Sequence, residues 1–546
     1  MILKITSIKN PNSSRFLSSF TVVAGTETST SHGAITYTAG SLASASVSNE
    51  VQSAGTLNKM TFTFQISNSI PQNGIIFITF PSQVQFKKSP SESVVTVSIY
   101  GVTQTGYTAT PTSRSIEITN LFSSAELAVQ ANDIVITMED LNNPESQITS
   151  NSFEYYTLDS SSNEVDKTTT GLTIQSTSPG VITLGSISPS SIIVDNEITV
   201  QFFETTDISP SNAFLRVYWP SEVTYVTSGT LVCDMVFGFT PNIPPCVVDT
   251  TNRYMQLSTY TSTSHLFSIG TFRNPLGAVT TSTWQLIVYD NSNNIIMQKT
   301  SDITYTTVTS TISVTSSIRP TSSTTVGIRA DYNIVFVPTS RMLSDSKIKI
   351  IFPVDQVKYD GTTACYNGAT NLGCTITDVD ASFFQVEITQ WCNTGAECTA
   401  GSTINFTLKD ALNPSWVTSP LSSTVQIFTI NTQLTGNPTI DEITTGVQFS
   451  PSLTPGTLTD ISVAKDAATN KVGEQTSYII SFTVVTEVQA GGQVKLTFPS
   501  EAVYKASSTA VVCTDTSTST AKTCTSTADA NNNVSSLTIT NACNAG

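Results

Sequence analysis

The chain has 546 residues, of which 12% are charged and 38% are hydrophobic, and its formal net charge is −16. With only 24 Lys and Arg residues, it lacks the basic surface that nucleic acid or an anionic membrane requires in a partner. Its apolar runs are far shorter than the roughly 20 residues of a membrane-spanning helix, and its abundant Ser, Thr, Val and Ile favour strands over long helices.

In chain order, four predicted strands with alternating apolar residues each end in an aromatic residue followed by proline. They end at Phe80-Pro81, Trp219-Pro220, Phe352-Pro353 and Phe498-Pro499. Alternation places one set of side chains in a core and the other in water, and proline ends a strand because it cannot donate a ladder hydrogen bond. A second alternating strand precedes each one after a short turn, which predicts a hairpin in every copy. These preceding strands contain Met60–Phe64, Ile198–Phe202, Tyr332–Phe336 and Tyr478–Phe482.

An Asn-Pro turn is the second recurring landmark, and each turn leads into a further predicted strand. The turns are Asn10-Pro11, Asn143-Pro144, Asn274-Pro275 and Asn413-Pro414, and the strands follow at 20–23, 153–156, 284–287 and 425–428. The prolines of the aromatic-Pro pairs are 139, 133 and 146 residues apart, and those of the Asn-Pro pairs are 133, 131 and 139 apart. Two landmarks with one period predict an all-β protein of tandem Ig-like antiparallel β-sandwich repeats of about 130–145 residues.

The phase of the repeat predicts half-domains at both ends. We expect residues 1–42 to be the C-terminal half of a repeat, 43–178, 179–308 and 309–449 to be complete repeats, and 450–546 to be the N-terminal part of a fourth. When Pro11 is aligned with Pro414, Met1, Leu3 and Ile5 align in sequence with the inward-facing residues of a strand in the third repeat. These three residues are therefore the predicted assembly strand. Three explanations remain open: a longer tandem chain, head-to-tail strand exchange between copies, and an unrelated truncation.

The cysteines follow the same period. Three pairs come shortly after the aromatic-Pro landmark, and each pair closes a short loop, which predicts a local disulfide. A zinc site is the alternative, but the chain has only two His and no Cys-x2-Cys pattern. Disulfides at this density imply an extracellular location, secreted or at the cell surface. The predicted bridges are Cys233 with Cys246, Cys365 with Cys374, Cys513 with Cys524 and Cys392 with Cys398, and Cys543 is left unpaired.

The residues that could support catalysis are few. His32 is predicted in a Ser/Thr/Gly turn and His265 in a Thr/Ser loop, and both are interpreted as incidental. No nucleophile elbow, phosphate-binding loop, zinc-protease or EF-hand pattern is present. We therefore predict a protein that is not an enzyme and has no catalytic residue.

A few residues could bind a metal ion or contact a ligand. Glu139-Asp140 and the Asp378/Asp380 pair could bind calcium, although solvated loop carboxylates explain them better, and no other cofactor or metal is expected. The tract 290–294 is interpreted as a hairpin turn. Trp219 is predicted to lie in the core, whereas Trp391 and Trp416 lie next to turns and could contact a ligand.

Three sequons predict N-linked glycans, at Asn12, Asn405 and Asn533. Asn405 alternates with the inward Ile404 and Phe406, so its side chain should point outward, as an attached glycan requires.

The alternating strand ending in Phe-Pro, the cysteine pair that follows it and the later Asn-Pro turn resemble the Ig-like repeats of very large secreted surface and filament proteins of protists, particularly ciliates. That resemblance covers the whole chain and implies an extracellular scaffold or glycosylated fibre without catalytic residues. The function predicted first is a structural filament or coat protein whose partners are copies of itself. The alternative is an adhesin that binds glycans or other cells through its loops.

Overall fold

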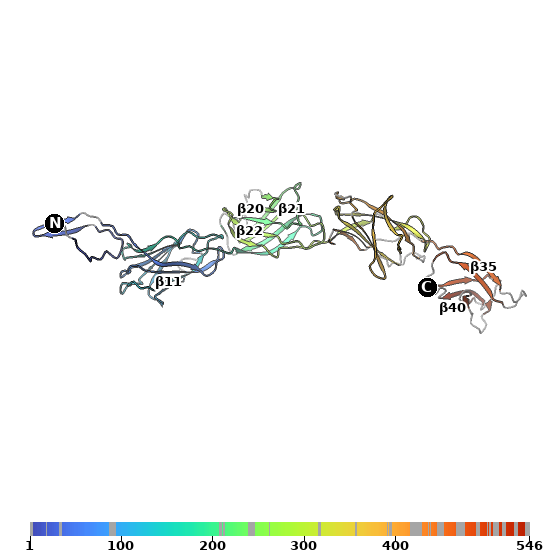
Figure 1. Ribbon diagram of the computed structural model, residues 1–546, viewed down its shortest axis with the longest axis horizontal. Helices are drawn as coiled ribbons and strands as arrows, with labels where there is room; N and C mark the ends of the chain where they lie inside the picture. Colours follow the sequence, from blue (N-terminus) through green and yellow to red (C-terminus); the bar gives the residue numbers. More distant parts are fainter. Residues whose placement is uncertain are drawn as a thin grey trace. The chain divides into compact units, whose positions relative to one another are not determined.

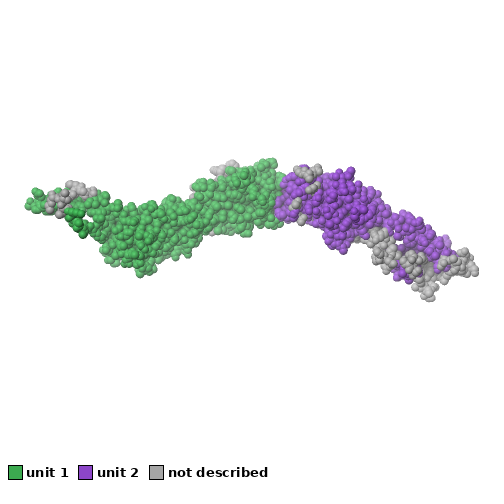
Figure 2. All heavy atoms as spheres, in the orientation of Figure 1, with its two compact units in different colours: residues 1–192, 197–274, 280–306 green, residues 193–196, 275–279, 307–546 purple. Residues whose placement is uncertain are grey.

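The structure, a computed structural model, describes residues 4–17, 19–31, 35–86, 94–206, 210, 213–237, 246–260, 263–314, 318–354, 357–389, 391–392, 396–414, 429–434, 436, 438–444, 453–465, 476–486, 492–499, 501, 504–505, 513–515, 520–528 and 533–540. They form two compact units (Figure 2). The first unit holds residues 1–192, 197–274 and 280–306, and the second holds 193–196, 275–279 and 307–546. Among the described residues there is no helix suited in length and hydropathy to crossing a membrane.

The first repeat is a two-layer sandwich, as its alternation predicts. One sheet has the order β3-β13-β12-β6-β10-β9 and the other the order β4-β5-β11-β7-β8. The strands are β3 (Gly40–Ser41), β4 (Ala43–Asn49), β5 (Leu57–Gln65), β6 (Ile75–Thr79), β7 (Val95–Ile99), β8 (Val102–Thr103), β9 (Thr108–Pro111), β10 (Ser115–Thr119), β11 (Ile134–Asn142), β12 (Glu154–Leu158) and β13 (Glu164–Thr168).

The second repeat, in which Figure 1 labels β20, β21 and β22, has the same two layers, joined by one strand. β14 pairs with β23 at its start and with β15 along the rest of its length. The path is β17-β21-β15-β14-β23-β22-β16-β20-β19, with β18 beside β21. The strands are β14 (Gly180–Pro189), β15 (Glu197–Thr206), β16 (Ala213–Tyr218), β17 (Thr224–Tyr225), β18 (Val232–Phe237), β19 (Val247–Asp249), β20 (Tyr254–Tyr260), β21 (Ser264–Arg273), β22 (Gln285–Asp290) and β23 (Ile295–Lys299).

The third repeat follows the same plan, with β24 as the strand that joins the layers. Its path is β29-β28-β32-β26-β24-β34-β33-β27-β31-β30, and β25 pairs with β26. The strands are β24 (Ser310–Val314), β25 (Arg319–Pro320), β26 (Arg329–Pro338), β27 (Lys347–Pro353), β28 (Ala364–Asn367), β29 (Thr370–Asn371), β30 (Thr375–Asp378), β31 (Phe383–Thr389), β32 (Ile404–Leu412), β33 (Thr429–Gln433) and β34 (Thr439–Ile443).

The two ends of the chain form smaller sheets. In the N-terminal arm (residues 1–39), β1 (Phe20–Ala24) and β2 (Glu27–Ser31) pair as a hairpin. In the C-terminal segment (residues 450–546), β35 (Thr459–Lys465) pairs with β36 (Tyr478–Thr483), and a second sheet has the order β37-β41-β40-β39 with β38 beside β41. These last strands are β37 (Val494–Thr497), β38 (Tyr504–Lys505), β39 (Cys513–Asp515), β40 (Thr520–Ala528) and β41 (Asn533–Thr540). The all-β architecture of tandem β-sandwich repeats is thus confirmed.

The predicted hairpin between consecutive alternating strands is wrong. β5 pairs with β4 and β11, whereas β6 pairs with β10 and β12, so the two strands lie in opposite layers. Their side chains meet across the core, where the ring centroids of Phe62 and Phe80 are 6.2 Å apart. The same holds for β15 with β16 and for β26 with β27. Alternation could not distinguish the two arrangements, because either one buries every second side chain.

The Asn-Pro landmark has a structural role beyond the turn. The Asn143 side chain is fully buried, and its Nδ2 donates to the carbonyls of Val51 and Ser53 at 2.7 and 2.8 Å. Its Oδ1 accepts from Asn58 at 2.9 Å and from Asn49 at 3.0 Å. The buried Asn274 and Asn413 amides donate to equivalent carbonyls, those of Ser191, and of Ser323 and Thr325. Each Asn therefore ties the end of one strand to the beginning of its repeat.

Candidate functional site

The aromatic-Pro strand of each complete repeat has a hydrogen-bonded neighbour on both sides. β6 lies between β10 and β12, β16 between β20 and β22, and β27 between β31 and β33. The equivalent β37 pairs with β41 on one side, and none of the strands that the structure describes pairs with its other side. β37 thus has an open edge where complete repeats place the strand that follows Asn-Pro.

The other layer of the C-terminal segment has a matching open edge. In the complete repeats, the equivalent strand has a neighbour on both sides: β5 lies between β4 and β11, β15 between β14 and β21, and β26 between β24 and β32. β36 pairs with β35 and with no further strand in the described part of the chain. As a result Tyr478 on β36 is 55% exposed, whereas Met60 and Tyr332 at the equivalent positions are fully buried.

The N-terminal arm contains the sequence equivalents of the strands that these edges lack. Val22 on β1 is 60% exposed, although the equivalent Tyr155 of β12 is fully buried. Ile5, from the predicted assembly strand, is 64% exposed, whereas the equivalent Leu408 is fully buried. Met1 and Leu3 lie outside the described residues. Residues of the arm are therefore exposed at positions that the complete repeats bury.

A recurring contact joins the Asn-Pro loop of one repeat to a hairpin of the next. Ser13 Oγ donates to Asp159 Oδ2 at 2.7 Å, and the equivalent Ser146 Oγ donates to Asp290 Oδ2 at 2.8 Å. Beside them, the backbone amides of Ser14 and Gln147 donate to the carbonyls of Glu164 and Ile295 at 2.7 and 2.8 Å. The arm is therefore docked on the first repeat in the same way as the first repeat is docked on the second.

At the third junction, formed by the loop after Asn274-Pro275, neither the serine nor the aspartate is present. The Ala278 amide donates to the Thr439 carbonyl at 2.8 Å, which preserves the backbone bond. Gly277 replaces the serine, and Leu434 replaces the aspartate. A Cβ on Gly277 would lie 2.7 Å from the Cβ of Pro438 and 3.3 Å from Leu434 Cδ1, so only glycine allows this close approach. The junctions are matched pairs, either Ser with Asp or Gly with an apolar partner.

The two junction aspartates are stabilised as carboxylates. Burial disfavours the charge on Asp159, but hydrogen bonds from Ser13, Asn163 and the turn backbone outweigh it and lower the pKa of this carboxyl. For Asp290, burial likewise opposes the charge, and bonds from Asn294, Ser146 and Ser292 again lower its pKa. The tract 290–294 is the predicted hairpin turn, between β22 and β23.

Acid should therefore loosen the two polar junctions and leave the apolar one unaffected. Because both folded pKa values lie below the ordinary Asp value of about 3.9, the carboxylates contribute stability above that value, and the contribution is lost as pH falls through the folded pKa. We expect hydrogen-exchange protection of the Ser14 and Gln147 amides, corrected for intrinsic rates, to fall below roughly pH 4. The Ala278 amide is the internal control, and an equal loss at all three amides would contradict the prediction.

The cysteines pair as their spacing predicts. The disulfides are Cys233–Cys246, Cys365–Cys374, Cys392–Cys398 and Cys513–Cys524, with Cα atoms 5.6–6.2 Å apart. Cys543 lies outside the described residues. The first repeat contains no cysteine and has the same two-sheet fold, so the bridge reinforces the sandwich without determining it.

The predicted glycosylation sites have different surroundings. Asn405 is exposed between the buried Ile404 and Phe406 on β32, which confirms its outward orientation. Asn12 is half-buried in the Asn-Pro loop of the arm. Asn533 begins β41, and its side chain lies outside the described residues. Whether these asparagines carry glycans stays a prediction.

The expectation that His265 lies in a loop is wrong. It lies on β21 with no exposed surface, and its Nδ1 is 2.7 Å from Oε1 of the equally buried Glu204 on β15. Tyr260 donates to the same Oε1 at 2.7 Å and stacks on the imidazole with ring centroids 3.8 Å apart. The sequence signal was Glu204, which occupies the next inward position after Phe202 in an alternating strand. His32 lies outside the described residues.

The candidate calcium ligands have other contacts. Asp378 accepts a hydrogen bond from Tyr359 at 2.9 Å, and Asp380 accepts the amides of Ser382 and Phe383 within its turn. Within the part of the chain that the structure describes, no three His, Cys, Asp or Glu side chains gather in a way that could hold a metal ion.

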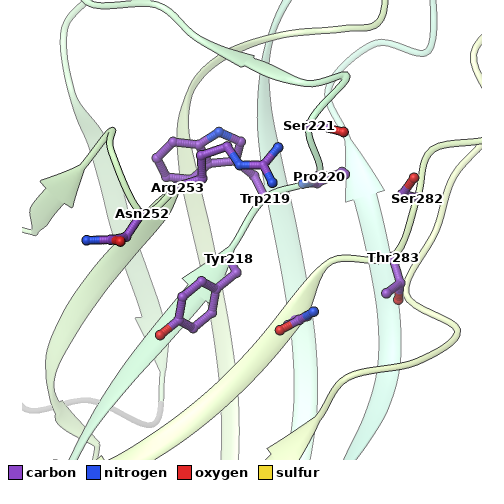
Figure 3. A pocket seen from close by; sticks show the side chains of 9 residues that line it. Tyr218, Trp219, Pro220, Ser221, Asn252, Arg253, Ser282 and Thr283 are labelled. Atoms are coloured by element: carbon purple, nitrogen blue, oxygen red, sulfur yellow. The ribbon is translucent and has the colours of Figure 1, made fainter.

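The second repeat has a shallow pocket of about 300 Å³ beside the end of β16 (Figure 3). Trp219 forms part of its wall but is 4% exposed and belongs to the core, as predicted. Arg253 is exposed, with a backbone φ of 54°, a region uncommon for non-glycine residues. Polar groups line the remainder, including Ser221, Asn252, Ser282, Thr283 and Gln285.

An aromatic surface adjoins this pocket through Tyr218. The guanidinium of Arg216, on the same strand, lies 4.6–5.0 Å from the ring centroids of Phe214, Tyr254 and Tyr289. Of the other tryptophans considered for ligand contact, Trp391 is half-buried against the third core, and Trp416 lies outside the described residues.

No known family profile matches the chain, and no curated protein matches it. Among solved structures, it is similar to the C-terminal domain of the AgI/II polypeptide BspA from Streptococcus agalactiae, with 11% identity, a TM-score of 0.20, and coverage of 48% of this chain and 100% of that one. A putative membrane-anchored protein from Corynebacterium diphtheriae has 12% identity and a TM-score of 0.18, with coverage of 79% and 95%. The collagen adhesin of S. aureus has 12% identity and a TM-score of 0.15, with coverage of 50% and 95%.

Proposed function

We propose that this chain is a structural protein of an extracellular filament or cell-surface coat, in which β-sandwich repeats are joined head to tail. The observation that carries the proposal is the complementarity of the two ends. Among its described residues, the C-terminal segment has one open edge in each layer, and the arm exposes the equivalents of the strands that lie along those edges in complete repeats. A head-to-tail contact of this kind does not close, so it extends into a filament.

The recurring junction supports the same function. A structural array requires that each repeat be held against the next, and the arm and the first repeat both use the same backbone hydrogen bond for this purpose. Four disulfides and the outward-facing Asn405 suit a glycosylated protein outside the cell. The repeats can be supplied by a longer tandem chain or by strand complementation between copies, and no enzymatic activity is proposed.

Electron microscopy and mass spectrometry of the native material test this function. We expect negative-stain images to show polymers or a coat, and dispersed single molecules would count against the proposal. Intact-mass measurement then separates the two routes. A mass near 58.3 kDa plus sugar supports complementation between copies, whereas a much larger mass supports a longer tandem chain.

An adhesin is the second candidate, and the pocket beside Tyr218 is the observation that favours it. The Tyr218 ring, the exposed Arg253 and the surrounding hydroxyl and amide groups could fix the orientation of a small ligand in this pocket. Binding of the full chain to a glycan array, lost in a Tyr218→Ala, Arg253→Ala double variant, would support this function. Absence of binding across the array would remove it.

A further inference from the structure

We infer that the open edges of β36 and β37 bind the N-terminal arm of a second copy, in the strand register that the complete repeats share. This inference rests on the proposed head-to-tail assembly and deepens it by naming the partner and the residues that meet. The occupant is a second copy because its arm contains the sequence equivalents of the strands that pair with the counterparts of β36 and β37 in the complete repeats. In the arm, residues of these strands are exposed.

The register at β37 follows from the equivalent strand pairs. In all three complete repeats, one pair of residues has the same place in the sequence motifs. Its first member is three positions before the proline of the aromatic-Pro pair, and its second is a buried residue of the strand that follows Asn-Pro. Ile78 is opposite Tyr155, Val217 opposite Leu286, and Ile350 opposite Ile430. In the first two repeats that partner is 11 residues after the proline of Asn-Pro. Applied to the ends of the chain, the same count places Val22 opposite Leu496 and Thr21 opposite Thr497.

The register at β36 follows from the first and third repeats. Met60 is opposite Met138, and Tyr332 is opposite Leu408, each partner being six residues before the proline of Asn-Pro. The same count places Ile5 opposite Tyr478. Both side chains are mostly exposed, and their equivalents in the complete repeats are buried. Two apolar edges would thus be covered at once, one in each layer.

The junction geometry supplies independent support. Ser13 and Ser14 already bind the first repeat through the hydrogen bonds that Ser146 and Gln147 make to the second. A sandwich completed by the arm would therefore be followed by the first repeat in the same arrangement as any other pair of repeats. Asn10 agrees, because it is exposed although Asn143, Asn274 and Asn413 are all buried.

Cysteine cross-linking of the full chain tests the register directly. In a Cys543→Ser background, the Thr21→Cys, Thr497→Cys variant places two cysteines on opposite residues, whose Cα separation in a sheet of about 4.5–5.5 Å suits a disulfide. We expect mild oxidation to yield a ladder of covalent multimers on non-reducing gels. The matched control, Ser29→Cys with Thr497→Cys, has its first cysteine on β2, one strand further away, and should yield few.

A second pair of variants separates inward from outward positions. Val22→Asp would place a charge in the shared core and should abolish assembly, whereas Thr21→Asp lies on the outer face and should preserve it, as measured by sedimentation. If the Val22→Asp chain still forms polymers, and the Thr21→Cys, Thr497→Cys chain does not cross-link, the register is wrong but the proposed function stands. If the unmodified chain forms no polymer and the native material shows none either, both the register and the proposed function are wrong.

Discussion

We expect a His265→Ala substitution to destabilise the second repeat by about 3–5 kcal/mol, because it leaves a buried polar group without a partner and opens a cavity in the core. The imidazole lies 2.7 Å from the Glu204 carboxylate, and neither side chain has exposed surface. Without the histidine, the carboxyl group would remain in the core, where the Tyr260 hydroxyl donates a hydrogen bond to it. Burial of a polar group that has lost a hydrogen-bonding partner is costly to a fold.

A triple variant provides the control. Replacing Glu204 and His265 with leucine and Tyr260 with phenylalanine removes the interacting polar groups together, and replacing hydrogen-bonded partners with apolar groups of similar shape can be nearly neutral. We expect it to lose much less stability than His265→Ala. Because the chain contains several sandwiches, one unfolding free energy does not describe it, and hydrogen exchange of the β15 and β21 amides is the suitable measurement. A loss below about 1 kcal/mol for His265→Ala would contradict the importance of the pair.

The second large effect is expected at Asn143. Its amide uses its full hydrogen-bonding capacity, with two donated and two accepted bonds. Asn143→Ala would leave the carbonyls of Val51 and Ser53 and two neighbouring amides without this partner inside the fold. At 1–3 kcal/mol for an unsatisfied buried group, we expect the first repeat to lose about 3 kcal/mol, measured by hydrogen exchange of the β5 and β11 amides.

Asn10 is the matched control, because it occupies the same position in the Asn-Pro motif but is exposed. Asn10→Ala should change stability by less than about 0.5 kcal/mol, as surface substitutions usually do. Similar losses for both variants would mean that the motif acts through its turn and not through the buried amide.

The sequence by itself determined the repeat, the strand class and the cysteine pairs. Alternating residues such as Ile76, Ile78 and Phe80 predict a strand with one buried face, because side chains alternate along an extended backbone. The equivalent spacing of Cys365 and Cys374 after Pro353 predicts a local bridge for a similar reason, since the contact is close in the chain. The exposed Ile5 also follows from the phase of the repeat, which is visible in the sequence as a period.

Only the tertiary structure decided which elements meet across long distances in the chain. Alternation is the same for a strand in either layer, so β5 and β6 could be predicted as strands but not assigned to opposite sheets. Ser13 and Asp159 are 146 residues apart, and neither residue type is unusual in a turn, so their contact has no local signal. Glu204 and His265 likewise come from different strands, and a carboxylate can remain buried only because the fold brings a partner to it. Local pattern determines which face of a strand is buried, whereas packing in three dimensions determines what that face contacts.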